Sequence, residues 1–471
     1  MGQTNLAWET LFDLSATSRG PLHVRLTAAI RAAIRSGRLP HGAALPPSRT
    51  LATDLGVSRW TVTQAYGQLI TEGYLTGRTG SATRVSWSPK PDDGPVERRV
   101  RQPPPPAHYD LDPCRSDLRA FPRRKWVAAV RIAAETVPFD QLNYSASGGH
   151  PQLRAVIADH LNRSRGSATE PGTVSIYSGA AQSLLQVSRA LFAAGHTRIG
   201  VENPGSERHW QAARTAGLEL VALPVDDDGL VVEALDANPG LRAVCVSAAH
   251  HPATGCVLGP HRRSALLDWA WRVDGLVVED DYDAEFNYDR PAPPTMRSTD
   301  PDRVALLGSM SKSLGPTVGI GWVVTPRRWV DAVRSSHELS LLPPILNQVA
   351  LAHFMESGAY DRHLRASRLR FRARRAALVA ALRRRLPECR MRGAEAGLHI
   401  LLELPAGTDA AAVVAEAQRR DLQLFNLDEM RFHPKPDEPA LLLGYSNLND
   451  SVVDDAVAVL VAVISQVGRP P

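Results

Sequence analysis

The chain has 471 residues, of which 44% are hydrophobic and 22% are charged, a composition typical of a globular protein with enough length for two or more domains. Four scattered cysteines argue against a disulfide framework or a zinc cluster and indicate a reduced, cytoplasmic setting. No apolar run reaches the roughly 18 residues that span a bilayer, and the first residues lack a signal-peptide pattern. We therefore expect neither a secreted nor a membrane protein.

The net charge of +5 is concentrated at one end of the chain. Residues 1–86 contain nine arginines and no lysine against four acidic residues, whereas the remainder carries as many basic as acidic side chains. A small basic unit joined to a large neutral one indicates an anionic partner for the small unit. An excess of five charges could also arise by chance.

The first 86 residues predict three short helices followed by a hairpin. The helices are expected at residues 21–36, 49–55 and 59–72, and the hairpin within residues 74–85. Ser48 and Ser58 precede the second and third helices as candidate N-caps, and Gly56 breaks the chain between these helices. Residues 87–108 are rich in proline and predict a stiff, extended linker.

Residues 109–471 alternate short apolar strands with amphipathic helices. Strands are expected at residues 174–177, 198–201, 218–223, 243–247, 275–278 and 304–307, with helices between them such as 181–193 and 261–272. This alternation predicts an α/β domain whose mostly parallel sheet is covered by helices on both faces. From about residue 347 onward, long helices and a β-hairpin region at 399–404 and 440–445 predict a smaller α+β lobe.

Two short helices separated by Gly56 fit a helix-turn-helix, in which the start of the second helix meets base edges in the major groove. Arg59 and Thr61 occupy that start, and Arg49 opens the preceding helix. Arg78, flanked by glycines, could form a wing that enters the minor groove. A small helical docking domain would show similar spacing.

Residues 45–66 and 69–75 resemble the winged helix of GntR-type regulators. The resemblance covers about 60 residues and implies contact with double-stranded operator DNA by Arg49, Arg59, Thr61 and the wing at Gly80. Trp60 departs from the polar residue that is usual at its position, which predicts an unusual base preference.

In the second domain, Lys312 follows an apolar strand and a Gly/Ser-rich turn. An amine at a strand end is placed for Schiff-base chemistry with an aldehyde, and Ser309 and Ser311 beside it could bind a phosphate. A lysine on a surface turn is the ordinary alternative.

Two further segments have features of the same kind of site. The strand before Asp280 ends in a carboxylate cluster, where Asp280 or Asp281 could hold a pyridinium nitrogen and Tyr282 could donate to the 3-oxygen of the ring. Ser178, Gly179, Ala180 and Ala181 lead from a strand into a helix, and such a helix start binds anions. An acidic metal site or a solvated loop would explain the carboxylates equally well.

The order of these motifs resembles fold-type I aminotransferases, and together with the winged helix it resembles the MocR subgroup of GntR regulators over nearly the whole chain. Segments 112–113, 121–126, 149–154, 201–205, 279–286, 311–314 and 443–445 carry this resemblance. It implies that pyridoxal 5'-phosphate binds with Lys312 as the Schiff-base lysine, Asp280 at the pyridine nitrogen and Tyr282 beside the 3-oxygen. It also implies a head-to-tail homodimer, in which Tyr144 reaches the phosphate of the other subunit and Arg208 lies near a substrate or effector carboxylate.

Four positions depart from the family pattern. Ser206 stands in place of a stacking tyrosine, Gly319 in place of a phosphate-binding arginine, and Leu442 in place of the arginine that grips a substrate carboxylate. Pro252 likewise offers the 3-oxygen no polar group. These departures favour binding over transamination, so we expect a DNA-binding regulator that senses pyridoxal phosphate or its adduct with a small amino compound.

Two other functions remain open on the sequence. The chain could be an active aminotransferase with an accessory DNA-binding domain, or a regulator whose aminotransferase-like domain holds no cofactor. Residues 360–385 contain ten arginines. They predict a solvated amphipathic helix of the small lobe, with a secondary DNA-contacting face as the alternative.

Overall fold

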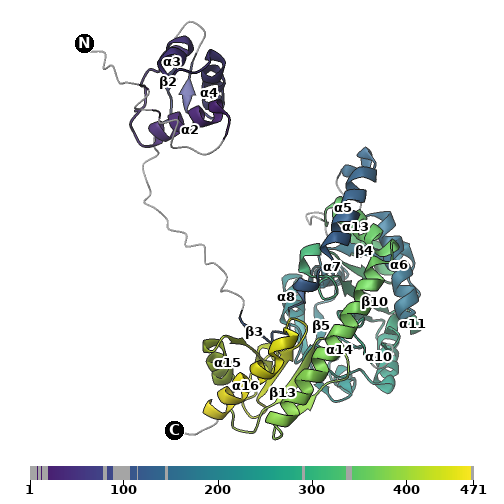
Figure 1. Cartoon of the computed structure of the whole chain (residues 1–471). Coiled ribbons are helices and arrows are strands. Elements are labelled where there is room, and N and C mark those ends of the chain that lie inside the picture. The colour runs from purple at the N-terminus through teal and green to yellow at the C-terminus, as the bar shows by residue number, and fades with distance from the viewer. Residues whose placement is uncertain are drawn as a thin grey trace. The chain divides into compact units, whose positions relative to one another are not determined.

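The computed structural model divides the chain into two compact units, Met1–Pro104 and Pro105–Pro471 (Figure 1). It describes residues 8, 12, 20–77, 82–87, 107–113, 115–143, 147–288, 292–335 and 342–467. The division falls within the proline-rich segment 87–108. Most of that segment lies outside the described residues, as do Arg78, Gly80 and Tyr144.

Within residues 20–77 and 82–87, the described core of the N-terminal unit, the chain forms three helices and a short hairpin. These elements are α2 (Leu22–Arg35), α3 (Ser48–Asp54), α4 (Arg59–Thr71), β1 (Leu75–Thr76) and β2 (Arg84–Val85). The two strands pair antiparallel, as the sequence predicts, with Leu75 opposite Val85. Leu26, Leu51 and Leu69 are fully buried between the helices, so each helix contributes an apolar face to one core.

The ends of α3 and α4 follow local rules. The Ser58 hydroxyl accepts a hydrogen bond from the Thr61 N–H at 3.1 Å, which confirms the predicted cap of α4. The prediction for α3 is wrong by one residue, because Ser48 is its first residue and Pro47 occupies the cap position without a side-chain bond. Gly56 adopts a φ of 61°, which glycine tolerates, and this turns the chain between the two helices.

The C-terminal unit is built on an eight-stranded sheet with the order β4-β11-β10-β9-β8-β5-β6-β7. The strands are β4 (Val174–Tyr177), β5 (Arg198–Asn203), β6 (Glu219–Asp226), β7 (Gly229–Leu230), β8 (Ala243–Val246), β9 (Leu276–Asp280), β10 (Val304–Ser309) and β11 (Gly321–Val324). All six predicted strands are present. Five of them, β10, β9, β8, β5 and β6, pair in parallel, which confirms the mostly parallel sheet, whereas β4 pairs antiparallel with β11.

Strand β11 was not predicted from the sequence. This strand pairs antiparallel with both β10 and β4, so it reverses the chain at one side of the sheet. It has only four residues and directly follows a glycine-rich turn, which hides a strand from pattern analysis. The core strands, by contrast, are apolar on both faces and read as continuous hydrophobic runs.

Helices cover both faces of the sheet. Alternate residues of each core strand enter different clusters: Ala243 and Cys245 of β8 face α7 (Ala180–Ala193) and α8 (Glu207–Thr215), whereas Val244 faces α10 (Pro260–Arg272). The other helices of this unit are α5 (Arg123–Thr136), α6 (Pro151–Arg165), α9 (Glu233–Asp236), α11 (Met296–Thr299), α12 (Val330–Ser335), α13 (Ile345–Glu356), α14 (Ala359–Arg385), α15 (Ala410–Arg419) and α16 (Val453–Val467). In the part of the chain that is described, no helix is long and apolar enough to cross a membrane.

The smaller lobe has a four-stranded sheet, ordered β12-β13-β16-β15. Its strands are β12 (Arg390–Arg392), β13 (His399–Glu403), β15 (Phe425–Asn426) and β16 (Ala440–Gly444), and a separate pair joins β3 (Tyr109–Asp110) to β14 (Leu422–Gln423). β13 and β16 do pair antiparallel, but they are no hairpin, because α15, β14 and β15 lie between them in the chain.

The arginine-rich helix α14 extends along this lobe beside α16 (Figure 1). Several of its arginines bind carboxylates of the same unit. Arg374 is buried and pairs with Asp117 and Asp450, Arg375 pairs with Glu395, and Arg384 pairs with Asp454. These pairs give the arginines a structural role and leave a smaller exposed set for any other contact.

Replacing Arg374 with alanine should strongly destabilise the C-terminal unit. The change leaves the buried Asp117 carboxylate without its closest cationic partner, a loss that typically costs about 3–5 kcal/mol. The matched control is Arg385→Ala at the exposed end of the same helix, which should stay within about 0.5 kcal/mol of wild type. Urea unfolding followed by circular dichroism measures both, and equal midpoints would contradict the assignment.

Candidate functional site

The candidate site lies at the edge of the large sheet where the parallel strands end. β9 ends at Asp280, and its neighbour β10 places Leu307 opposite Asp280. Lys312 follows β10 by three residues, and its ammonium group lowers the pKa of Asp280, so the two side chains interact electrostatically. Ligands of open α/β sheets bind at this carboxyl edge.

Asp280 is a buried carboxylate with an unsatisfied oxygen. Burial and the neighbouring Asp281 and Asp283 raise its pKa to about 8, while Lys312 opposes that rise. Its Oδ1 is buried without a hydrogen-bond partner, and its Oδ2 lies 3.6 Å from His209 Nε2. A buried polar atom without a partner calls for an explanation. A cationic ring nitrogen would satisfy it, so this position fits the pyridinium of pyridoxal phosphate.

Asp281, the other carboxylate considered from sequence, is already paired. Arg165 binds both of its oxygens at 2.9 Å. A bidentate guanidinium pair of this kind is among the strongest polar contacts in proteins. Asp281 therefore serves the structure, and Asp280 is the carboxylate available to a ligand.

Tyr282 is held by a buried histidine. His250 Nδ1 lies 3.0 Å from the Tyr282 hydroxyl and 2.9 Å from Asp283 Oδ2. Gly397 has a φ of 74°, and a Cβ there would lie 2.0 Å from the His250 ring, so only glycine leaves room for this imidazole. Burial raises the pKa of Tyr282 well above its usual value, which keeps the phenol protonated and able to donate a hydrogen bond.

The predicted phosphate-binding segment forms a strand-to-helix turn. Gly179 adopts a φ of 147° just before α7, and Gly321 of β11 packs so closely that a Cβ there would lie 2.5 Å from Gly179 Cα. The N–H of Ser178 already donates to Gln182 Oε1, so the first turn of α7, with Ala180 and Ala181, supplies the open N–H groups.

Ser309 and Ser311 form a linked pair beside Lys312. Their hydroxyls lie 2.9 Å apart, and the N–H of Ser311 donates to Ser309 Oγ at 3.1 Å. Ser116 donates to the Ser311 carbonyl and so fixes the turn that carries the lysine. The pair presents two hydroxyl groups at the strand end, a suitable arrangement for binding an anion.

Two histidines of the site, His209 and His399, were not predicted from the sequence. Burial lowers the pKa of His209 to about 4, so it is a neutral partner for Asp280. The rings of His250 and His399 lie in contact at a tilt of 48°, with centroids 5.1 Å apart, and the Nε2 atoms of both are buried without partners. Among the described residues, no histidine, cysteine and carboxylate group is arranged to hold a metal ion. The sequence does point to His250 and His251, which follow the end of β8 and are candidates to replace the missing cofactor contacts.

Arg208 lies beside His209 on α8 but is exposed, whereas His209 faces the site. Successive residues of a helix point about 100° apart, so Arg208 points away from the site when His209 faces it. The predicted contact of Arg208 with a carboxylate remains a prediction, and Tyr144 cannot be placed because it lies outside the described residues.

The N-terminal unit exposes two of its predicted DNA-contacting side chains. Arg49 on α3 and Arg59 at the start of α4 are exposed. Thr61 is buried, and its hydroxyl lies 2.8 Å from Ser58 Oγ, so it stabilises the helix start and does not face outward as expected. Arg78 and Gly80 of the wing lie outside the described residues.

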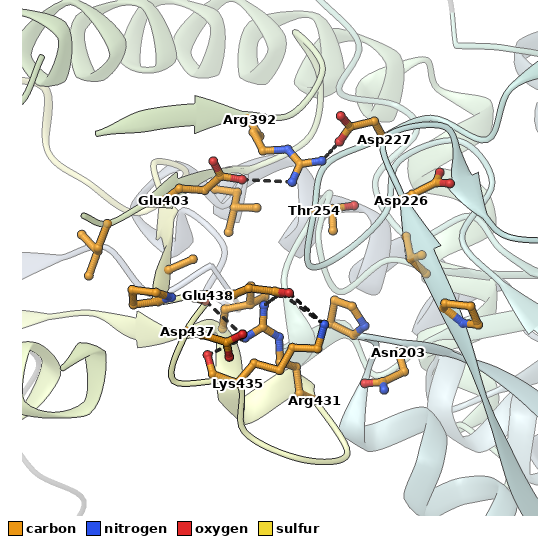
Figure 2. Close-up of a pocket in the computed structure, with 18 of the residues that line it drawn as sticks. Asn203, Asp226, Asp227, Thr254, Arg392, Glu403, Arg431, Lys435, Asp437 and Glu438 are labelled. Carbon is orange, nitrogen blue, oxygen red and sulfur yellow. Dashed lines mark hydrogen bonds and ion pairs between the residues drawn. The ribbon is translucent and has the colours of Figure 1, made fainter. Parts of the chain in front are cut away.

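A separate cavity of about 1030 Å³ lies between the β6–β7 loop and the smaller lobe (Figure 2). Its charged side chains mostly pair with one another: Arg392 contacts Asp227 and Glu403, and Glu438 binds Arg431 and Lys435. None of the residues predicted to bind the cofactor lines it. The cavity is therefore distinct from the site at the sheet edge.

Comparison with known proteins identifies both units. Residues 22–85 match the model of bacterial regulatory proteins of the gntR family, and residues 118–424 match the model of aminotransferases of class I and II. The chain is 30% identical over 459 residues to the probable rhizopine catabolism regulatory protein MocR of Rhizobium meliloti, covering 93% of this chain and 92% of that protein. It is 35% identical over 383 residues to the pyridoxine biosynthesis transcriptional regulator PdxR of Corynebacterium glutamicum, covering 80% and 82%.

Solved structures support the fold of the larger unit. An archaeal alanine:glyoxylate aminotransferase superposes with a TM-score of 0.69 at 20% identity, covering 76% of this chain and 91% of that chain. The kynurenine aminotransferase of Pyrococcus horikoshii gives 0.69 at 22% identity, with 77% and 91% covered. The chain therefore belongs to the MocR subgroup of GntR-family transcription regulators, in which a winged helix-turn-helix is fused to a fold-type I aminotransferase domain.

Proposed function

We propose that this DNA-binding regulator binds pyridoxal 5'-phosphate as a Schiff base on Lys312 and responds to the cofactor, or to its adduct with a small amino compound, by changing its affinity for operator DNA. The observation that carries the proposal is the buried, unpartnered Oδ1 of Asp280 at the sheet edge that also holds Lys312. The curated relative PdxR is a regulator of pyridoxine biosynthesis, which supports the same ligand class.

The residues of the chain would divide the binding between them. When bound, the cofactor supplies an aldehyde for the Lys312 amine and a ring that withdraws electrons. Asp280 would hold the ring nitrogen, and a positive charge there would return the carboxylate to its ionised form. Tyr282, fixed by His250, would donate to the 3-oxygen. The first turn of α7, Ser309 and Ser311 would hold the phosphate, completed by Tyr144 of a second subunit.

Binding is favoured over transamination by the surroundings of Leu442. This residue is fully buried in an apolar cluster with Ala253, Leu401 and Leu427, so no cation occupies that position to grip a carboxylate. Gly319, at a φ of 64°, brings no charge to the phosphate side. A transaminase must hold its substrate through two half-reactions, and the exposed Arg208 alone would have to serve that purpose.

Exposed apolar side chains on α5 and just beyond it support the proposed head-to-tail homodimer. Val127 and Ile132 on α5 are 64% and 43% exposed, and Phe139 and Leu142 just beyond that helix are 94% and 50% exposed. Large exposed apolar groups clustered in one part of the chain are typical of a protein interface.

Removing Arg49 or Arg59 should weaken operator binding without unfolding the chain. Both side chains are exposed, and loss of a charged contact to DNA typically costs about 1–3 kcal/mol, or roughly 5- to 150-fold in affinity. Gel-shift assays with the upstream region of the gene at several salt concentrations compare Arg49→Ala and Arg59→Ala with wild type. Affinity of wild type should fall steeply with salt, and unchanged affinity of both variants at moderate salt would refute the assignment.

Addition of pyridoxal phosphate to the purified protein should produce the red-shifted absorbance band of a protonated Schiff base. Lys312→Ala should abolish the band because it removes the amine. Asp280→Asn keeps the Lys312 amine and should still form the Schiff base, but it should bind pyridoxal phosphate more weakly because it removes the negative partner of the ring nitrogen. If wild type and Lys312→Ala give the same spectrum, the cofactor proposal is wrong and the larger unit is a scaffold without a cofactor.

The cofactor should also shift operator affinity several-fold, and Lys312→Ala should not respond. Only a ligand that binds the two DNA-affinity states unequally can do this. Gel-shift titrations with and without pyridoxal phosphate measure the shift. Assays with common amino acids and 2-oxoglutarate should show no sustained turnover. Multiple turnover together with DNA binding indifferent to the cofactor would favour the aminotransferase instead.

A further inference from the structure

Among the described residues of the N-terminal unit, Trp60 is the most exposed large apolar side chain, at 62% exposure. It is the second residue of α4, directly after the Ser58 cap and Arg59. The buried face of this helix consists of Thr61, Val62, Ala65, Tyr66 and Leu69. Trp60 lies outside that face, on the stripe that also exposes Arg59 and Thr63.

The ring of Trp60 contacts a neighbouring side chain but stays largely exposed to solvent. It meets His23 of α2 edge to face, with ring centroids 5.5 Å apart. Another exposed tryptophan, Trp271 at 57%, is instead stacked against the Arg303 guanidinium at 4.3 Å. Trp60 thus keeps a broad apolar face open, and the contact with His23 limits the freedom it would lose on binding.

The first turn of the second helix in a helix-turn-helix lies at the floor of the major groove. The apolar group that the major groove offers is the C5-methyl of thymine. An indole presents no acceptor and a single donor, so its flat carbon surface suits a methyl group better than it suits a polar base edge.

We propose that Trp60 reads a thymine methyl group in each half-site of the operator, next to the position read by Arg59. Burying one methyl group contributes about 0.8 kcal/mol, which corresponds to a fourfold change in affinity for each half-site. The preference is for the methyl group itself, so a 5-methylcytosine presents the same feature and a uracil lacks it.

The test uses the full-length protein and duplexes selected by it from a random pool. In the selected sites, thymine at the Trp60 position is replaced by uracil, and in a second pair cytosine there is compared with 5-methylcytosine. Wild type should lose about fourfold for each thymine-to-uracil change and gain on cytosine methylation. Trp60→Ala should bind thymine and uracil duplexes equally, whereas Trp60→Phe, which keeps an apolar ring and lacks the indole N–H, should keep the preference.

Ile70→Ala is the matched control, because Ile70 is an exposed apolar residue on the last turns of the same helix. It should retain the methyl preference of wild type. Circular dichroism checks that every variant is folded. If Trp60→Ala loses the same factor of affinity for thymine and uracil duplexes, it keeps the methyl preference of wild type. That result would overturn the proposal.

Discussion

The parallel pairing of β9 with β10 is the constraint on which the candidate site depends. Because neighbouring parallel strands end at the same edge of the sheet, Asp280 and the turn that carries Lys312 meet although 32 residues separate them in the sequence. The pairing is held by apolar side chains on both faces, Ala305 and Leu307 towards one helical layer and Val277 towards the other. The position of Asp280 relative to Lys312 therefore depends on the packing of apolar side chains along the two strands.

Burial gives this edge its electrostatic character. It raises the pKa of Glu279 and Glu285 to about 7 and that of Asp280 and Glu202 to about 8. The pKa values of these four acids therefore lie near pH 7. Burial also lowers the pKa of His209 and His251, which keeps both imidazoles neutral. A cationic ligand in such a place would be bound by a carboxylate that has few competing partners. Burial makes ionisation of the acid costly, and a nearby positive charge offsets that cost, so ionisation of the acid and binding of a cation favour each other.

The arginines show how one residue type serves different ends in the two units. In α14, Arg374 and Arg375 pair with carboxylates of their own unit. The surface of this helix therefore carries less positive charge than its number of arginines suggests. In the N-terminal unit, Arg49 and Arg59 are exposed, and Arg31 instead pairs with Glu72. Composition alone could not divide these groups, because pairing depends on which carboxylates the fold brings near.

The sequence by itself determined the two-part organisation, six strands of the mostly parallel large sheet and the motif order that indicates an aminotransferase-like site. These features depend on local signals, namely apolar runs, caps and glycine turns, which operate over a few residues. Tertiary structure alone decided that Asp281 pairs with Arg165 while Asp280 stays open, that His209 enters the site, and that Thr61 is buried. Each of those outcomes depends on how the fold directs a side chain and on what packs against it, because strand order and helix packing join residues that are remote in the chain.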